Sequence, residues 1–283
     1  MIPAAFDYVE AESIQHALAL LGQHDDSKLI AGGHSLVPMM KLRLATPSVL
    51  IDIGRLDELS RIEDRGDHVA VGALARHRSV ERSALLAQHV GLLAHIAAQI
   101  GDPQVRNRGT MGGSMVHCDP AADLPAAALA LRSTMVIAGA NGERREVPAS
   151  DFFLGFMETA VAHGEMLIEV RYPKQTLPQQ TAAKQTLGWN YQKFCRRAMD
   201  YAIVGVAVQL GADPGIALVN MGSVPHFAAA ASSALAAGES AARVAELVVE
   251  GTDPLADANA TADYRRHLAR TLTARALAAA GYA

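Results

Sequence analysis

The chain has 283 residues, half of them hydrophobic, and its formal net charge is −4. This length allows two or three domains around a large core, and the interspersed charges exclude the one-sided basic surface that nucleic acid requires. No run of 18 apolar residues occurs and no basic segment precedes an apolar one at the N-terminus, so neither a transmembrane helix nor a signal peptide is expected.

The first 55 residues are predicted to form a small βαβ-like unit. Apolar residues recur at helical spacing over residues 6–22, with Ser13 close to the start of that helix. Short apolar strands are expected at 28–31 and 49–53, and the first of them runs into the pair Gly32-Gly33.

Residues 56–175 are predicted to add a second sheet and several helices. The pair Asn141-Gly142 is typical of a tight hairpin turn between two strands. The strands are expected at 59–64, 68–73, 133–138, 144–148 and 166–172. The helices are expected at 80–88, 91–100 and 121–131.

A polar, aperiodic tract at 174–188 is the best candidate for a domain boundary. The predicted domains are 1–175, with subdomains of about 1–55 and 56–175, and 178–283. In the second domain, strands of an antiparallel sheet are expected at 189–195, 202–210 and 215–221, and alanine-rich helices at 226–250 and 255–280. Mixed β and α elements, then strands followed by helices, indicate an α+β fold class.

The chain is organised around residues 100–125, which read IGDPQVRNRGTMGGSMVHCDPAADLP. Between residue 101 and the helix expected from residue 121, this segment is predicted to be neither helix nor strand, because it holds prolines, three glycines and few large apolar residues. The pair Gly112-Gly113, between Thr110 and Ser114, offers consecutive backbone amides with no Cβ in the way, which suits an anion-binding nest. Taken alone, the pattern leaves a tight structural connection open as an alternative.

A second glycine loop favours the anion-binding interpretation. Residues 28–44 read KLIAGGHSLVPMMKLRL, in which a strand runs into Gly32-Gly33, His34 and Ser35. Two such loops, some 80 residues apart, could hold one pyrophosphate from opposite sides. Neither loop is a G-x-G-x-x-G or a Walker sequence, so a Rossmann or P-loop nucleotide site is disfavoured.

The cysteines and histidines indicate no metal site. Cys118 and Cys195 are too few for an iron–sulfur cluster, which takes four thiolates, and both are expected to be reduced residues of a cytoplasmic protein. The eleven histidines lack the H-x-x-x-H spacing of a zinc site. Redox chemistry in this protein would therefore need an organic cofactor.

The segments AGGHSLVPMMKLRLA, GTMGGS and DPAADLPA resemble the FAD-binding medium subunits of molybdenum hydroxylases, above all of aerobic carbon monoxide dehydrogenases. The likeness runs along the whole chain. It implies a two-part FAD-binding domain of the vanillyl-alcohol-oxidase type, followed by a smaller domain with a three-stranded antiparallel sheet and helices. It also implies one FAD, held noncovalently, because in this family the position of His34 lies in a phosphate loop and carries no tether.

The resemblance further implies which residues bind the cofactor. Asp123 matches a position that hydrogen-bonds a cofactor hydroxyl, and Lys193 matches a lysine at the pyrimidine end of the flavin. Leu167 matches a position on the adenine side, and Tyr201 matches an aromatic residue against the isoalloxazine, although a tyrosine at a strand start is more often a packing residue. The pyrophosphate segments and one further cofactor-binding position comprise Lys28, Leu29, Ala31, Gly32, Gly33, His34, Ser35, Leu36, Thr110, Met111, Gly112, Gly113, Ser114 and Ile100.

No catalytic acid–base pair stands out, and His117 near Asp119 and Asp123 is best interpreted as structural.

The leading hypothesis is an electron-transfer flavoprotein subunit, with molybdenum cofactor on a large partner and [2Fe–2S] clusters on a small one. A dimer of such heterotrimers is expected in the cytoplasm, where the complex could lie at the inner face of the membrane. Carbon monoxide is the favoured substrate and a purine or N-heterocycle the alternative, while the terminal electron acceptor stays open. A self-contained flavin oxidase and a nonenzymatic nucleotide-binding module are the other hypotheses.

Overall fold

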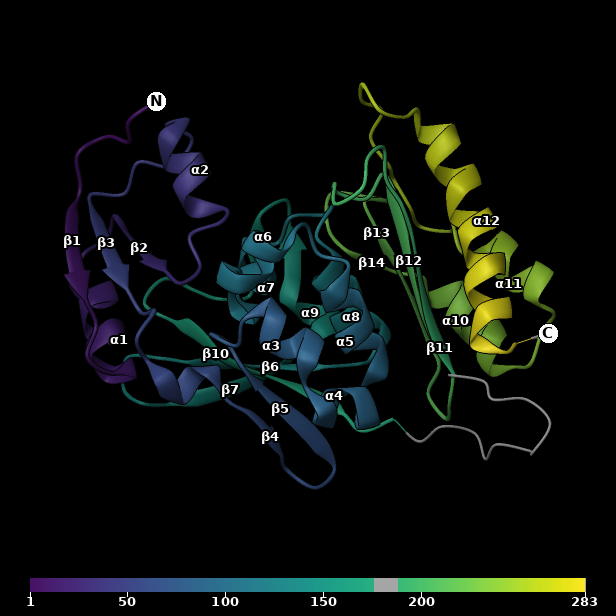
Figure 1. Ribbon diagram of the computed structural model, residues 1–283, viewed down its shortest axis with the longest axis horizontal. Helices are drawn as coiled ribbons and strands as arrows, with labels where there is room; N and C mark the ends of the chain where they lie inside the picture. The colour runs from purple at the N-terminus through teal and green to yellow at the C-terminus, as the bar shows by residue number, and fades with distance from the viewer. Residues whose placement is uncertain (176–187, 283) are drawn as a thin grey trace.

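The computed structural model describes residues 1–175 and 188–282. Three regions follow one another along its longest axis: an N-terminal lobe, a central sheet covered by helices, and a C-terminal sheet backed by a long helix (Figure 1). The tract predicted as a domain boundary, 174–188, and the expected start of the second domain at 178 lie largely outside the described residues. The fold is α+β, as predicted.

The N-terminal lobe is built on a parallel sheet of three strands in the order β1-β3-β2. Its strands are β1 (Asp7–Glu10), β2 (Ser27–Ile30) and β3 (Val49–Asp52), and its helices are α1 (Ile14–Gln23) and α2 (Leu36–Lys41). Ser13 caps α1 by accepting a hydrogen bond from the His16 amide at 3.1 Å. The prediction of a helix from residue 6 is wrong, because residues 7–10 pair in parallel with β3, a tertiary contact that local periodicity does not reveal.

The central sheet is antiparallel, with the strand order β4-β5-β10-β6-β7. Its strands are β4 (Ile62–Asp64), β5 (His68–Gly72), β6 (Thr134–Ala138), β7 (Arg144–Pro148) and β10 (Met166–Pro173). The hairpin predicted at Asn141-Gly142 joins β6 to β7, and Gly142 has the left-handed φ of 79° that such a turn needs. The strand predicted from residue 59 begins later, because η1 (Asp57–Ser60), a short 3-10 helix, precedes β4.

Seven short helices and a small two-stranded sheet complete the central region. Their bounds are α3 (His77–Arg82), α4 (Ala84–His89), α5 (Gly91–Ala98), α6 (Pro103–Arg108), α7 (Met111–His117), α8 (Asp123–Ala130), α9 (Ala149–Phe152), β8 (Phe153–Gly155) and β9 (Glu158–Thr159). The single helix predicted at 80–88 is two, because Ser83 ends α3 and its hydroxyl caps α4 by accepting a hydrogen bond from the Leu86 amide.

Each face of the C-terminal sheet packs against a different hydrophobic core. Val204, Val206 and Val208 pack with the C-terminal helices, whereas Ala207, between them, packs with the core that contains α8. This alternation follows from the two-residue period of a strand, and it binds the C-terminal sheet to both neighbouring layers. The elements are β11 (Trp189–Phe194), β12 (Val204–Gln209), β13 (Gly215–Val219), β14 (His226–Phe227), α10 (Ala229–Ala236), α11 (Ala241–Leu247) and α12 (Ala262–Ala280).

The three predicted C-terminal strands are present, and the short strand β14 pairs with β13 as a fourth. The helix predicted at 226–250 is therefore shorter at its start, and it is divided into α10 and α11 near Gly238, where φ is +74°. The last helix starts at residue 262 instead of 255, because the Thr261 hydroxyl caps it by accepting from the Tyr264 amide.

Candidate functional site

The first glycine loop leaves β2 and enters α2. Gly33 has a φ of +75°, a left-handed conformation that residues with a Cβ rarely adopt. Among the described residues, none accepts a hydrogen bond from the amides of the run Gly32 to Leu36. The hydroxyl of Ser35 makes no capping hydrogen bond either. This loop therefore presents consecutive donors for an external acceptor, which is the arrangement that an anion requires.

The second glycine segment is helical, so the prediction that it is neither helix nor strand is wrong. Asp102 caps α6, with its carboxylate accepting from the Val105 amide at 2.8 Å, and the Thr110 hydroxyl caps α7, accepting from the Gly113 amide at 3.2 Å. The Thr110 cap offsets the low helix propensity of the two consecutive glycines in α7. Gly112 is also required by packing, since a Cβ there would lie 2.7 Å from the Cβ of Ala73.

The amides of this second segment are already used. The Met111 and Gly112 amides donate to the carbonyls of Ala75 and Ala73 at 2.9 and 2.8 Å, and the Ser114 amide donates to the Thr110 carbonyl at 3.1 Å. The expectation that both loops offer free amides is therefore wrong for the second one. What it presents is the exposed backbone of Gly113 and the side-chain hydroxyl of Ser114.

The two loops are in direct contact. A Cβ on Gly32 would overlap the carbonyl oxygen of Arg108, and it would lie 3.0 Å from the Cα of Gly109. Only glycine lets the backbones approach this closely. The predicted pyrophosphate segments thus lie side by side, with free amides from one and the Ser114 hydroxyl from the other, and these groups fit a diphosphate.

A buried ion pair lies at the junction of the central and C-terminal regions. Asp123, the first residue of α8, accepts from Lys193 Nζ at 2.8 Å and from the Tyr191 hydroxyl at 2.5 Å. Lys193 also donates to the Gln99 carbonyl at 3.2 Å. Burial raises the pKa of Asp123, and the charge of Lys193 opposes this increase. Sequence reasoning predicted Asp123 and Lys193 but missed Tyr191, although its position two residues before Lys193 puts it on the same face of β11.

The remaining predicted positions lie in different surroundings. Leu167 is buried in the core of the central region with Met111, and Ile100 packs against that core. Tyr201 is 64% exposed, beyond the end of β11. Lys193 lines a pocket of about 370 Å³ between the turn after α5 and the segment after β11. The other lining residues are Ala98, Gln99, Gly101, Pro103, Arg106, Cys195, Met199 and Asp200.

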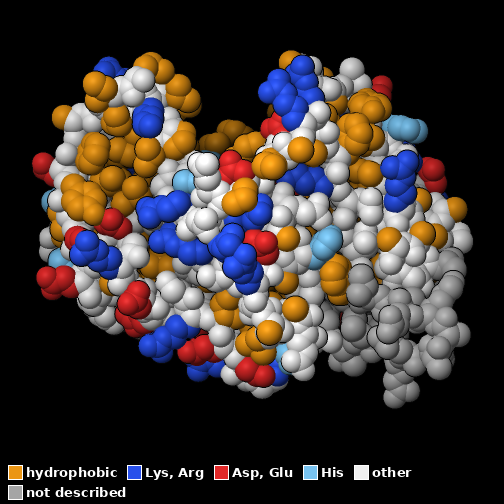
Figure 2. All heavy atoms as spheres, viewed as in Figure 1, with side chains coloured by type: hydrophobic (Ala, Val, Ile, Leu, Met, Phe, Trp, Pro, Cys, Tyr) orange, Lys and Arg blue, Asp and Glu red, His pale blue; other side chains and the backbone are white. Residues whose placement is uncertain are grey.

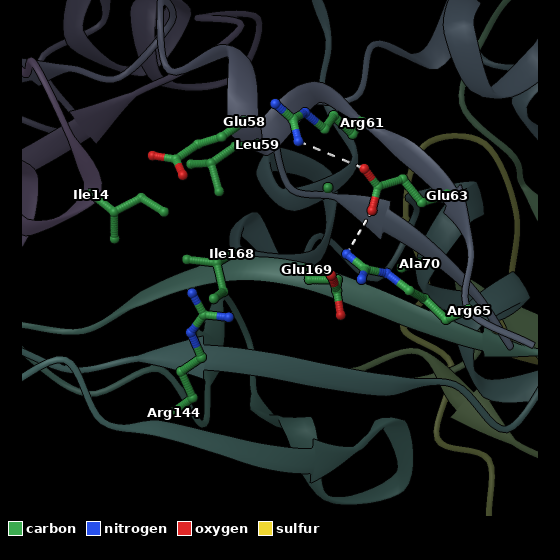
Figure 3. Close-up of a pocket in the computed structure, with 11 residues that line it drawn as sticks. Ile14, Glu58, Leu59, Arg61, Glu63, Arg65, Ala70, Arg144, Ile168 and Glu169 are labelled. Carbon is green, nitrogen blue, oxygen red and sulfur yellow. Dashed lines mark ion pairs between the residues drawn. The ribbon is translucent and has the colours of Figure 1, made fainter.

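A second pocket, of about 180 Å³, lies between α1, η1 and the central sheet (Figure 3). Charged side chains line it, and Glu63 pairs with Arg61 at 3.8 Å and with Arg65 at 2.5 Å. None of its lining residues belongs to either glycine loop or to the buried ion pair. The candidate cofactor site is therefore the region of the glycine loops and Lys193.

His77 lies beneath the second glycine segment and was not predicted as part of the site. A Cβ on Gly109 would lie 2.6 Å from its ring, and Nδ1 of the imidazole has no hydrogen-bond partner among the described residues. Burial, together with the neighbouring His34, Arg76 and Arg106, lowers the pKa of His77 from 6.5 to about 4. The imidazole is therefore neutral in the folded protein at pH 7.

We expect this histidine to make the fold sensitive to mild acid. Since the folded pKa lies below the unfolded one, the neutral ring stabilises the fold above about pH 6.5, and this contribution is lost as the pH falls to about 4. The loss should approach about 3 kcal/mol, and His77→Gln should remove it. Urea unfolding at pH 7 and pH 4.5 measures the difference, and an equal pH dependence in the variant would contradict the assignment.

Comparison with known proteins is consistent with this geometry. Residues 4–175 match the family described as "FAD binding domain in molybdopterin dehydrogenase", and residues 189–280 match the "CO dehydrogenase flavoprotein C-terminal domain". The chain belongs to the FAD-binding medium subunits of the molybdenum hydroxylases. It is accordingly a subunit of an oxidoreductase.

Relatives of this family match almost the whole chain. The carbon monoxide dehydrogenase medium chain of Hydrogenophaga pseudoflava is 39% identical over 99% of this chain and 98% of its own. The nicotine 6-hydroxylase medium subunit of Paenarthrobacter nicotinovorans is 35% identical over 98% of each chain. A solved carbon monoxide dehydrogenase from Hydrogenophaga pseudoflava, which lacks the Mo-pyranopterin moiety, aligns with a TM-score of 0.89 and 40% identity over 99% of this chain and 98% of that one.

Within residues 1–175 and 188–282, the structure contains no helix that combines the length and the hydrophobicity of a membrane span. Over the same ranges, no three His, Cys, Asp or Glu side chains are grouped so that they could hold a metal ion.

Proposed function

We propose that this medium subunit binds one FAD noncovalently and passes electrons from [2Fe–2S] clusters of a partner subunit to a terminal acceptor. The observation that carries the proposal is the contact between the two glycine loops, one with a run of free amides and the other with an exposed glycine backbone. Bound FAD would supply a group that accepts and releases one or two electrons. The pyrophosphate segments would hold it at one end and Lys193 at the other.

The chain's own side chains support an electron-transfer role more than a self-contained oxidase. A flavin oxidase needs a base free to take a proton from substrate. The buried carboxylate nearest the site, Asp123, is instead engaged by Lys193 and Tyr191. Substrate oxidation would then occur on a large partner subunit with molybdenum cofactor, in a cytoplasmic dimer of heterotrimers.

The proposed substrate of the complex is carbon monoxide. The support is the similarity to carbon monoxide dehydrogenase medium chains, at 39% identity in one case. The nicotine 6-hydroxylase medium subunit, at 35%, favours an N-heterocycle as the alternative. Reduction of the flavin in the purified complex by carbon monoxide, but not by N-heterocycles, under anaerobic conditions would support the first substrate. The reverse result would establish the second.

Noncovalent binding leads to a direct test. The purified protein should contain about one FAD per chain, because the loops offer hydrogen-bond donors and no side chain has to form a bond to the flavin. Acid precipitation should then release the flavin into the supernatant. A yellow pellet would show a covalent link, and a colourless purified protein that takes up no FAD would contradict the proposed cofactor.

A comparison of the isolated chain with its assembled complex tests the electron-transfer role. The flavin of the isolated chain should not be reduced by substrate, whereas the flavin in the complex should be. Turnover by the isolated chain at the rate of the complex would replace the proposal with the self-contained oxidase.

A further inference from the structure

Arg76 contacts the second glycine segment and the residue beside which the first loop lies. Its backbone forms an isolated antiparallel bridge with Thr110, which caps the second glycine segment. Its guanidinium donates from Nη1 to the carbonyl oxygen of Arg108 at 2.5 Å. The same carbonyl oxygen abuts Gly32 of the first loop. The side chain of Arg76 is therefore fixed where the two loops meet.

The positive charge of Arg76 has no carboxylate partner within 4 Å among the described residues, and neither has that of Arg108. Burial and the nearby charge of Arg108 lower the pKa of Arg76, while Asp52 opposes them. The carboxylate of Asp52 is occupied by the Tyr8 hydroxyl at 2.6 Å and the Gly54 amide at 2.7 Å. Two neighbouring cations without a counterion destabilise each other, and an anion placed between them would relieve this cost.

Lysine and arginine side chains gather over α3, α6 and α7, below the hollow between the two outer lobes (Figure 2). Several surface arginines elsewhere in the described chain pair with acidic side chains, as Arg145 does with Glu165 and Arg171 with Glu146. At the junction of the loops, the guanidinium of Arg76 donates instead to a backbone carbonyl.

We propose that Arg76, with Arg108 beside it, supplies the positive charge that binds the diphosphate of FAD in the site proposed above. The amides of the second segment donate within the protein, so the hydrogen bonds left for two phosphate charges come mainly from the first loop. A guanidinium has five N–H donors, and the contact with Arg108 uses only Nη1. The remaining donors can engage phosphate oxygens, a charge-assisted contact that neutral amides do not replace.

Two conservative substitutions separate the charge of Arg76 from its role as a tether of the Arg108 carbonyl. Arg76→Gln keeps an N–H donor but loses the charge, and Arg76→Lys keeps the charge but loses the fork. Arg82→Gln is the matched control. Arg82 is exposed at the end of α3, the helix that Arg76 precedes, and its substitution removes one positive charge, as Arg76→Gln does. Arg108→Gln provides a variant that keeps the backbone carbonyl contacted by both Gly32 and Arg76.

The experiment is a titration of the full-length, flavin-stripped protein with FAD at low and high salt, followed by flavin fluorescence, with ADP as a competing diphosphate. Arg76→Gln should bind FAD and ADP about 10- to 100-fold more weakly at low salt. Arg108→Gln should show a smaller loss, while Arg76→Lys should recover most of the affinity and Arg82→Gln should match the wild type. The difference between wild type and Arg76→Gln should shrink at high salt, because ions screen partly exposed charges.

Four results would overturn the inference. Wild-type affinity in Arg76→Gln would overturn it and leave the proposed FAD site intact, whereas a wild-type protein that binds no FAD would overturn both. An equal loss in Arg76→Lys and Arg76→Gln, with a lowered unfolding temperature in each, would show that Arg76 is only a tether. If Arg76→Gln does not fold, Arg108→Gln and the salt dependence of the wild type decide together, because unchanged FAD affinity in that variant and a wild-type affinity that does not fall at high salt would overturn the inference.

Discussion

Gly113→Val should leave the protein folded and weaken FAD binding by on the order of 100-fold. Gly113 is exposed in the first turn of α7, and a Cβ there would meet only the Thr110 hydroxyl, at 2.7 Å. The expected cost to stability is about 1 kcal/mol for the disturbed cap. The two branches of valine would nevertheless stand on the surface that the diphosphate has to approach. Flavin content after purification and FAD titration measure the effect.

Gly22→Val is the matched control for this substitution. Gly22 is also exposed and helical, near the end of α1, and a Cβ there would meet nothing within 4 Å. This variant should bind FAD like the wild type, since valine at an exposed helical site changes stability only slightly. Equal FAD affinity in Gly113→Val and wild type would show that the second glycine segment does not contact the cofactor.

Asp123→Ala should destabilise the fold by about 3–5 kcal/mol. The carboxylate is 7% exposed and it is the partner of both Lys193 and Tyr191. Its removal would leave a buried ammonium group and a buried hydroxyl without their acceptor, and the desolvation cost of a charge is then no longer offset. The pair also joins α8 to β11, so the two regions should separate more easily. Urea unfolding followed by circular dichroism measures the loss.

An exposed ion pair provides the comparison. Asp213→Ala removes the partner of Arg132, a pair at 3.3 Å whose side chains are 72% and 39% exposed, and it should cost less than about 1 kcal/mol. In the double variant Asp123→Ala/Lys193→Met, part of the stability lost in Asp123→Ala should return, because no uncompensated charge stays buried. Similar small losses for Asp123→Ala and Asp213→Ala would mean that Asp123 is not a buried counterion.

Elements whose signals are local could be predicted from residue type and spacing. Caps and turns such as Ser13 and Asn141-Gly142, and the alternating strands of the C-terminal sheet, depend on neighbours within a few residues and were predicted close to where they lie. The glycine pairs, with their flanking hydroxyl residues in order along the chain, likewise indicated the family and its cofactor before any coordinates. Residue type and spacing suffice there, because close backbone approach requires glycine wherever the partner comes from.

Contacts between distant segments set which hydrogen-bond donors of the two glycine loops are free and which are occupied. Residues 7–10 are a strand because β3 lies beside them, and the Gly112-Gly113 segment is a helix because Ala73 and Ala75 accept its amides. Those acceptors lie almost 40 residues away in the sequence, so no local pattern reveals that the amides are occupied. For the same reason, no local pattern indicates that Arg76 and His77 lie beside the glycine loops. Their burial against the glycine loops is set by contacts between distant segments, and such contacts control both the accessibility of a hydrogen-bond donor and the free energy of a charge.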